Sequence, residues 1–130
     1  MKTQLNSLDA PTIDPKVIDG LRNLFDDKVE AQTFLNELIT TYQSAGSETL
    51  AELQATLVAG NRSGTAAKAH KLKGLSRNIG AKRLGDLCAV LEMETREQES
   101  SLTVSTLSQT LEQEFCASCD ELGKTYVRAG

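Results

Sequence analysis

The stretch AHKLKGLSRNIGAKRLGDLCAVLE, residues 69–92, carries the clearest helical pattern of the chain. Apolar residues recur in it at helical spacing on both sides of Gly80, a residue suited to ending a helix. The second half is the more regular, because its apolar residues follow an i, i+3, i+4, i+7 pattern: Leu84, Leu87, Cys88 and Leu91. Two amphipathic helices joined by so short a link pack as antiparallel neighbours. The stretch therefore predicts a helical hairpin, with one helix over residues 63–79 and the next beginning at Ala81.

Helical periodicity extends over the rest of the chain, and the alternation typical of strands occurs nowhere in it. Asp14 and Pro15 predict the start of a short first helix, since a side-chain cap followed by proline suits a first helical turn. We expect Asp26 and Asp27 to close this helix.

The remaining apolar stripes complete the fold. Stripes at 34–42 and 50–58 belong either to two helices or to one, because the glycine and serines of residues 44–47 weaken a helix without always breaking it. A last stripe predicts a helix over 104–126, after a polar stretch at 97–101. We therefore predict an all-α fold, an up-and-down antiparallel four-helix bundle with a short additional N-terminal helix.

Size and composition fit one domain. The chain has 130 residues, of which 39% are hydrophobic and 25% charged, and its net charge of -4 is typical of soluble globular proteins. We assign residues 1–12 to an N-terminal tail and residues 13–130 to the domain. Neither a membrane-spanning apolar run nor a signal peptide is recognisable. We therefore expect a cytoplasmic protein that binds no membrane, and a monomer, since one bundle of this size can close its own core.

The three cysteines, Cys88, Cys116 and Cys119, are expected to be reduced thiols, because an odd number does not make a disulfide framework. Cys116 and Cys119 form a single C-x-x-C motif on an expected helix. Zinc would need a second such pair, and a redox site would need a strand before the helix. We interpret both cysteines as ordinary helix residues.

The only histidine, His70, lies on the expected helix at 63–79. At about 100° per residue, the apolar residues of this helix cluster on one side, and His70 points the other way. Around its imidazole come three residues with little or no side chain and two cations: Ala66, Ala67, Lys73, Gly74 and Arg77. Glycine inside a helix costs roughly 0.5–1 kcal/mol relative to alanine, so Gly74 predicts that another molecule approaches closely here.

The surroundings of His70 are basic although the chain is acidic. No aspartate or glutamate occurs between Glu52 and Asp86, while half of all basic residues lie there: Arg62, Lys68, Lys71, Lys73, Arg77, Lys82 and Arg83. Such a patch suits an anionic ligand or an acidic protein face. A solvated face is the plain alternative. Nucleic-acid binding is disfavoured, because the chain is acidic and only 4% aromatic.

The chemistry available on this face is that of a phosphoryl acceptor. Neutral imidazole is a nucleophile near pH 7, and Lys73, one turn from His70, can stabilise phosphoryl oxygens by charge. Phosphoryl transfer also needs a metal ion and carboxylates to hold it, and we expect this face to offer no carboxylate. The partner must bring those parts. We therefore predict that this chain has no metal site and no cofactor of its own.

Residues 69–92 resemble the signature of the histidine phosphotransfer (HPt) domain. The likeness covers the His-x-x-Lys-Gly core at His70, Lys73 and Gly74, the link at 80–81, and the pattern that follows, Leu84, Leu87, Cys88, Leu91 and Glu92. This resemblance implies a phosphorelay. In that system His70 accepts a phosphoryl group from the aspartate of a receiver domain, commonly in a hybrid sensor kinase, and donates it to the receiver of a response regulator. Lys73 would stabilise the phosphoryl group, and Gly74 would give steric access.

The resemblance also indicates where the partner binds. We expect the receiver domain to contact the residues around His70: Ala66, Ala67, Lys71 and Arg77. Mg²⁺ is expected only in the partner receiver domain.

Two other classes of protein would share parts of this pattern. A sensor kinase fragment would need glycine-rich loops for ATP, and none occurs. We therefore predict a phosphocarrier without kinase or phosphatase activity of its own. A docking module would bind a receiver through the same surface without moving phosphate, and the sequence leaves this alternative open. Replacing His70 by glutamine would leave such a module active and abolish a phosphorelay.

Overall fold

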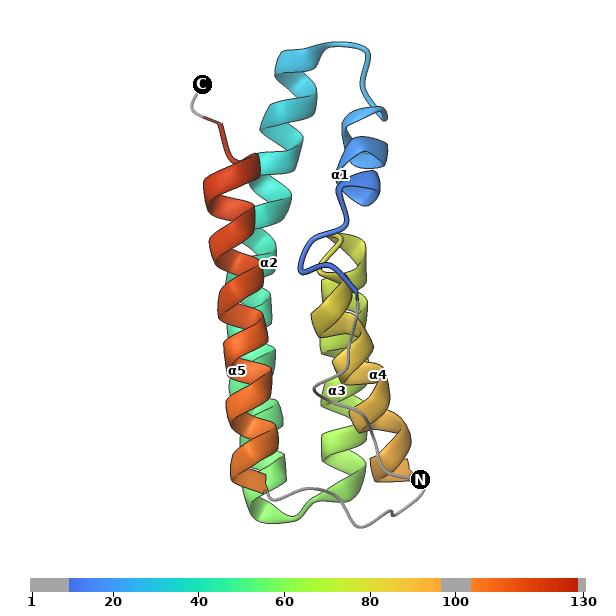
Figure 1. Cartoon of the computed structure of the whole chain (residues 1–130), viewed down its shortest axis with the longest axis vertical. Helices are drawn as coiled ribbons and strands as arrows, with labels where there is room; N and C mark the ends of the chain where they lie inside the picture. Colours follow the sequence, from blue (N-terminus) through green and yellow to red (C-terminus); the bar gives the residue numbers. More distant parts are fainter. Residues whose placement is uncertain (1–9, 97–103, 129–130) are drawn as a thin grey trace.

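The regular secondary structure of the described residues is entirely helical. The computed structural model describes residues 10–96 and 104–128 (Figure 1), and within these ranges it contains α helices, one π-helical turn and no strand. The elements are α1 (Pro15–Arg22), α2 (Lys28–Ala59), α3 (Arg62–Asn78), α4 (Lys82–Arg96), α5 (Val104–Glu121) and the π-helical turn η2 (Leu122–Tyr126). The predicted all-α class is confirmed. The predicted hairpin is also confirmed, with both inner helix ends within one residue of their expected positions.

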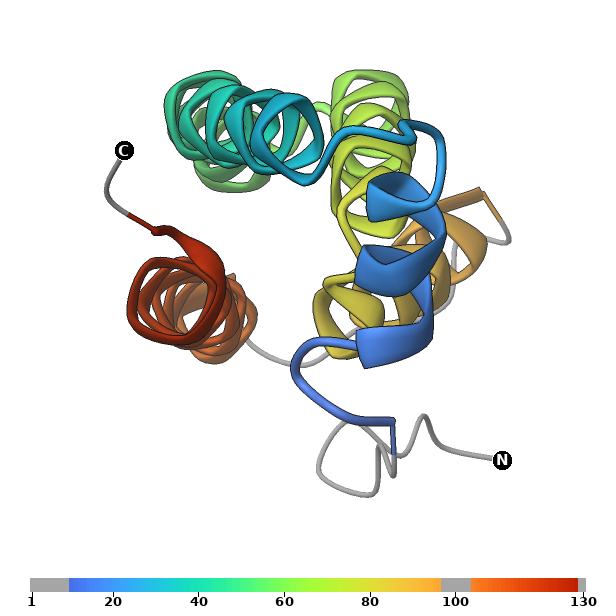
Figure 2. The same ribbon diagram turned by 90° about the horizontal axis from the view of Figure 1, so that it is seen from above.

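The four long helices surround one core. Helix α2 packs against α3 and α5, and α4 packs against the same two helices. Each long helix runs in the direction opposite to the one before it, and Figure 2 shows the four in cross-section. Helix α2 has 32 residues and α3 has 17, which correspond to lengths of about 48 and 26 Å. The short helix α1 lies over the α3–α4 link and beside the first turns of α2, where it fills the space that this difference leaves.

The core is built from leucine and isoleucine contributed by every element. Fully buried side chains include Ile18, Leu35, Ile39, Leu53, Leu72, Leu84, Leu87, Leu91, Leu107, Leu111 and Leu122. Complete burial of one such side chain stabilises a fold by roughly 1.5–3 kcal/mol. This packing holds α3 and α4 firmly, so their outer surfaces can be occupied by polar residues.

Helix α2 is continuous, which settles the alternative that the sequence left open. Gly46 lies in its middle and is buried against the ring of Phe115 from α5. A Cβ atom placed on Gly46 would lie 2.5 Å from Phe115 Cε1, so the glycine lets the two helices approach each other. The same ring lies 5.4 Å from that of Tyr42, centroid to centroid, and the hydroxyl of Tyr42 bonds Ser118 Oγ at 2.7 Å. Gly46 therefore serves packing and does not end the helix.

One predicted helix end was wrong. Asp14 caps α1 as expected, but α1 ends at Arg22, and Asp27 caps the start of α2 by accepting hydrogen bonds from the amides of Val29 and Glu30. An aspartate satisfies free amides at the beginning of a helix, and the macrodipole disfavours it at the end. The aspartate pair should therefore have been interpreted as the start of the next helix.

Gly80 has the role predicted for it. Its φ of +85° belongs to the left-handed region, which glycine adopts without strain. A side chain there would also crowd the start of α1, because a Cβ atom would lie 3.1 Å from both the carbonyl oxygen of Asp14 and the Cβ of Val17. The carbonyl of Gly80 accepts a hydrogen bond from Asp14 N at 2.8 Å. The link between α3 and α4 thus also anchors α1.

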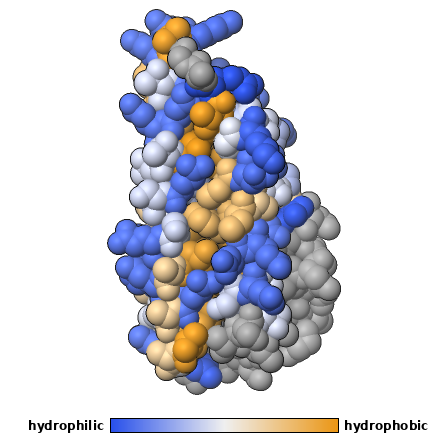
Figure 3. Space-filling model, turned by 90° about the vertical axis from the view of Figure 1, so that its left-hand side faces the viewer, coloured by the Kyte–Doolittle hydropathy of each residue, from blue (hydrophilic) through white to orange (hydrophobic). Residues whose placement is uncertain are grey.

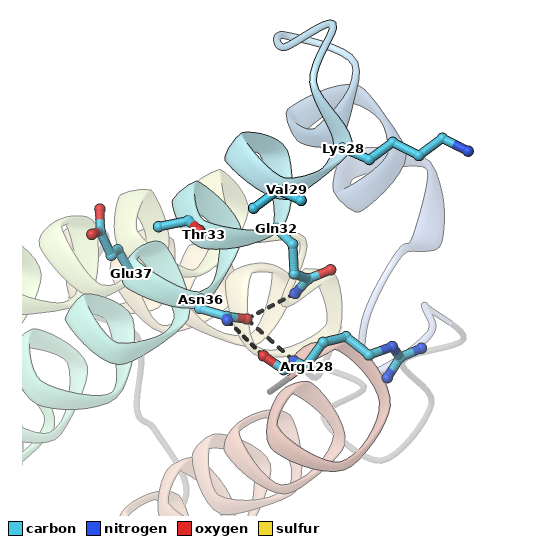
Figure 4. A pocket seen from close by; sticks show the side chains of 7 residues that line it. All are labelled: Lys28, Val29, Gln32, Thr33, Asn36, Glu37 and Arg128. Carbon is cyan, nitrogen blue, oxygen red and sulfur yellow. Dashed lines mark hydrogen bonds between the residues drawn. The ribbon is translucent and has the colours of Figure 1, made fainter. Parts of the chain in front are cut away.

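Both ends of the described chain are tied to the helices. Arg83 N donates to Pro11 O, and Arg83 Nε donates to Ala10 O. These contacts do not test the domain boundary at residue 13, which stays a prediction. The polar stretch at 97–101 lies outside the described residues. At the other end, Asn36 Nδ2 donates to Arg128 O, and Arg128 N donates back to Asn36 Oδ1 (Figure 4). Gln32 Nε2 donates to Tyr126 O in the same way.

The cysteines are free thiols, as predicted. Cys88 is buried in the core, and this burial raises the pKa of its thiol to about 12. Cys116 and Cys119 lie on α5, with Cys116 exposed.

The side of the molecule formed by α2 and α5 carries a narrow hydrophobic strip between hydrophilic margins (Figure 3). None of the helices in the described ranges is long and apolar enough to cross a membrane.

Candidate functional site

Helix α3 presents His70 to solvent. Asn61 caps this helix by accepting a hydrogen bond from Gly64 N at 3.0 Å, and its apolar side enters the core through residues such as Ala69 and Leu72. The side chain of His70 lies on the other side of the helix and is 65% exposed. The orientation predicted from helical periodicity is therefore confirmed.

A carboxylate lies directly beside the imidazole. Glu92 of α4 places its Oε2 atom 3.1 Å from His70 Nδ1. Lys73 Nζ donates to Glu92 Oε1 at 2.8 Å, and Arg96 Nη2 donates to Oε2 at 2.8 Å. The expectation that this face offers no carboxylate was wrong. That expectation considered the neighbours of His70 on its own helix, whereas Glu92 reaches it from the next helix.

The charge state of Glu92 determines which nitrogen of His70 is protonated. Burial alone would raise the pKa of Glu92, whose side chain is only 10% exposed, but hydrogen bonds from Lys73 and Arg96 more than offset this and lower it. The group is therefore ionised near neutral pH and can only accept hydrogen bonds. The hydrogen in its contact with the imidazole must then belong to His70 Nδ1. In the neutral imidazole, Nε2 would then carry the lone pair, which makes it the nitrogen available as a nucleophile.

Neither Glu92 nor Arg96 was predicted from the sequence as a site residue. A signal for Glu92 was present, because it lies four residues after Cys88 and extends the buried stripe of α4. A charged residue on a core-facing stripe requires partners. Arg96 follows four residues later, at the spacing of a helical ion pair.

Gly74 is open to solvent, one turn beyond His70. A Cβ atom built on it would meet no atom within 4 Å. The fold itself therefore does not require a glycine at this position. The absence of a side chain is consistent with close approach by another molecule. Lys73, in contrast, is only 21% exposed and turns toward α4.

The other predicted contact residues differ in exposure. Ala67 and Lys71 are exposed, as expected. Ala66 is buried with 8% exposure, because α4 packs against its side of α3, and it forms part of the floor of a hollow. Arg77 is half exposed, passes over Gly85 and reaches Asp86 at 3.4 Å.

The basic patch is partly neutralised. Lys68 pairs with Glu52 at 2.9 Å, and Lys82 pairs with Asp86 at 3.7 Å. These carboxylates flank the stretch without acidic residues in the sequence, and the fold brings them back to the cations. Among the described residues, these ion pairs leave Arg62 and Lys71 without a carboxylate partner, so the described face stays positive, although less so than the sequence indicated.

Two hollows flank His70 along α3 and α4. One, of about 310 Å³, is lined by Lys73, Ala89, Glu92, Met93 and Arg96. The other, of about 510 Å³, is lined by Arg62, Ser63, Ala66, Ala67, Thr95 and Arg96. Arg96 belongs to both and lies between them.

No cluster of His, Cys, Asp or Glu suited to a metal ion occurs among the residues for which coordinates are described. Cys116 and Cys119 belong to α5, which is not part of the surface around His70. The candidate site therefore consists of His70, Glu92, Lys73 and Arg96, with Gly74 as the open approach.

Comparisons with known proteins agree on one family. Residues 37–124 match the family described as the Hpt domain. A crystal structure of histidine-containing phosphotransfer protein B (HptB) from Pseudomonas aeruginosa PAO1 is similar, with a TM-score of 0.78 and 29% sequence identity over 94% of this chain and 100% of that chain. No curated protein sequence matches.

Proposed function

Because the chain belongs to the Hpt domain family, we propose that His70 accepts a phosphoryl group from the aspartate of a receiver domain, such as that of a hybrid sensor kinase, and passes it to the receiver aspartate of a response regulator. The observation that carries this proposal is the exposed imidazole, with Nδ1 held by Glu92 and Nε2 free. An isolated surface histidine would have no need for such an arrangement.

The transfer step follows from this geometry. The lone pair of His70 Nε2 attacks the phosphorus of the aspartyl phosphate, a new N–P bond forms, and the O–P bond to the aspartate breaks. The aspartate leaves as a carboxylate. Nδ1 keeps its proton and shares it with Glu92, so the positive charge that develops on the ring is offset nearby. Onward transfer is the same step in reverse.

Lys73 and Arg96 can stabilise the negative charge of the incoming phosphoryl group. Both cations are held on Glu92, close to the imidazole, before any phosphoryl group arrives. Arg96 is 62% exposed and free to turn toward a phosphoryl group on Nε2. We expect Lys73→Ala to slow transfer or shorten the lifetime of the phosphorylated form, because charge stabilisation is lost. Unchanged kinetics would mean that Lys73 does not stabilise the phosphoryl group and only holds Glu92 in place.

The partner supplies the remaining parts of the reaction. A receiver domain would bring Mg²⁺ and the carboxylates that hold it, so this chain needs no cofactor and acts as a phosphocarrier without kinase or phosphatase activity of its own. Gly74, with open space above it, lets the partner approach His70. Ala67, Lys71, Arg77 and the hollow over Ala66 would contact it. We also propose that the chain works as a monomer in the cytoplasm, folded as an up-and-down antiparallel four-helix bundle with α1 as the additional helix.

The test is incubation of the purified chain with a phosphorylated receiver domain and, separately, with ATP and magnesium. The measured quantity is acid-labile, base-stable phosphate on the wild type and on His70→Gln. We expect label from the receiver only, and only on the wild type. Label from ATP would indicate a kinase. Receiver binding without any label, over a broad panel of receivers, would indicate a docking module.

A further inference from the structure

We propose that the hollow between Arg62 and Arg96, beside His70, binds a carboxylate side chain of the partner receiver and so helps to select the receiver that exchanges phosphoryl groups with this chain. The proposal rests on the phosphorelay function stated above. It adds a second recognition point to the reacting histidine and assigns a role to Arg62, which has no part in the transfer step.

The hollow is built by two helices. The first turns of α3 contribute Arg62, Ser63, Ala66 and Ala67, and the last turn of α4 contributes Thr95 and Arg96. Among the described residues, its lining includes the guanidinium groups of Arg62 and Arg96, the hydroxyls of Ser63 and Thr95, and the methyl groups of Ala66 and Ala67. A volume of about 510 Å³ admits an acidic side chain together with water. The described lining of this open hollow therefore offers a carboxylate two cationic donors and two hydroxyls.

The two arginines have unused hydrogen-bonding capacity. Arg96 uses Nη2 on Glu92, while its side chain stays largely exposed. Arg62 is exposed, and no carboxylate of residues 10–96 or 104–128 forms an ion pair with it. Guanidinium groups bind carboxylates through paired hydrogen bonds, which gives geometric selectivity as well as attraction. The described lining of the hollow offers no carboxylate that would compete.

The distance from His70 fits a single docked partner. Ser63 precedes His70 by seven residues on the same helix, which is about 10 Å along the axis. A receiver whose aspartate meets His70 Nε2 would reach the hollow with a neighbouring segment. Because such a partner must hold a metal ion with carboxylates, its face is acidic around the reacting aspartate. One more acidic side chain on that face would complete the contact.

The test uses a receiver domain that transfers its phosphoryl group to the wild-type chain. Arg62→Glu is compared with Lys28→Glu, which makes the same change of charge at the first residue of α2, at the α1 end of the molecule. We expect Arg62→Glu to raise the KM for the phosphorylated receiver about tenfold or more with little change in the maximal rate, and Lys28→Glu to change the KM less than about twofold. Equal effects of the two variants would overturn the proposal.

Two further readouts exclude a fold defect. An acidic residue at the start of α3 should raise the melting temperature of Arg62→Glu by about 1–3 °C, so transfer would weaken while stability increases. Single Asp→Arg or Glu→Arg variants of the receiver are then tested. One of them should transfer poorly to the wild type and recover with Arg62→Glu. Absence of any such pair would overturn the proposal, while transfer to the wild type would still support the phosphorelay function.

Discussion

The replacement Glu92→Gln tests the arrangement around His70 through its effect on stability. The carboxylate accepts a hydrogen bond from Lys73, a largely buried cation, at 2.8 Å. A hydrogen bond to a charged group contributes about 1.5–3 kcal/mol, and the exposed i, i+4 pair with Arg96 adds roughly 0.3–0.5 kcal/mol. Glutamine retains an acceptor and loses the charge. We therefore expect the free energy of unfolding at pH 7 to fall by about 1–2 kcal/mol.

Urea denaturation of the wild type and Glu92→Gln measures this difference. Because the pKa of Glu92 is lowered in the folded state, its contribution is present above the pKa of an unfolded glutamate, about 4.3, and is lost as pH falls through the folded-state pKa. The two stabilities should therefore converge at acidic pH. Asp86→Asn is the matched control, because Asp86 lies on the same helix, is more exposed and pairs at 3.4 and 3.7 Å. Equal stability of wild type and Glu92→Gln at pH 7 would show that the charge of Glu92 does not stabilise the fold.

The same substitution at two glycines should have opposite effects on unfolding. Gly74→Ala should stabilise the fold by roughly 0.5–1 kcal/mol, because the added Cβ meets no other atom. Gly46→Ala should destabilise the fold by about 1–3 kcal/mol, because its Cβ would collide with the ring of Phe115. Urea denaturation measures both changes, and changes of the same sign would contradict the packing. A bulky residue at Gly74 should block transfer in the receiver assay, while circular dichroism should show unchanged helical content. Normal transfer by this variant would show that Gly74 is not needed for access to His70. Tyr42→Phe should cost about 1 kcal/mol in the same denaturation measurement, because the buried hydrogen bond to Ser118 Oγ is lost, and no change would show that this bond contributes nothing.

The sequence predicted those parts of the fold that depend on local pattern. The hairpin around Gly80, the cap at Asp14 and the outward direction of His70 all follow from periodicity and backbone preference within one or two turns of helix. The continuity of α2 could not be derived in this way. It depends on Gly46 meeting Phe115, almost seventy residues later in the chain, and no local preference reports such a contact.

The site was predicted incompletely for the same reason. His70, Lys73 and Gly74 share one helix, so their spacing places them together. Glu92 and Arg96 come from α4, and only the packing of two helices brings the carboxylate to His70 Nδ1. A helical wheel of α3 alone suggests an uninterrupted positive face. The fold instead places a negative charge at its centre and leaves the cations oriented around it.

Phosphorylation of His70 at Nε2 can be observed directly by ¹⁵N NMR of the imidazole after transfer from a phosphorylated receiver. The chain contains a single histidine, so the ring signals belong to His70 without further assignment. We predict that phosphorylation changes the Nε2 signal to that of a substituted nitrogen, while Nδ1 stays protonated and bonded to Glu92. A phosphoryl group on Nδ1, or an unmodified ring in a chain that has received phosphate elsewhere, would show that Nε2 of His70 is not the phosphoryl acceptor.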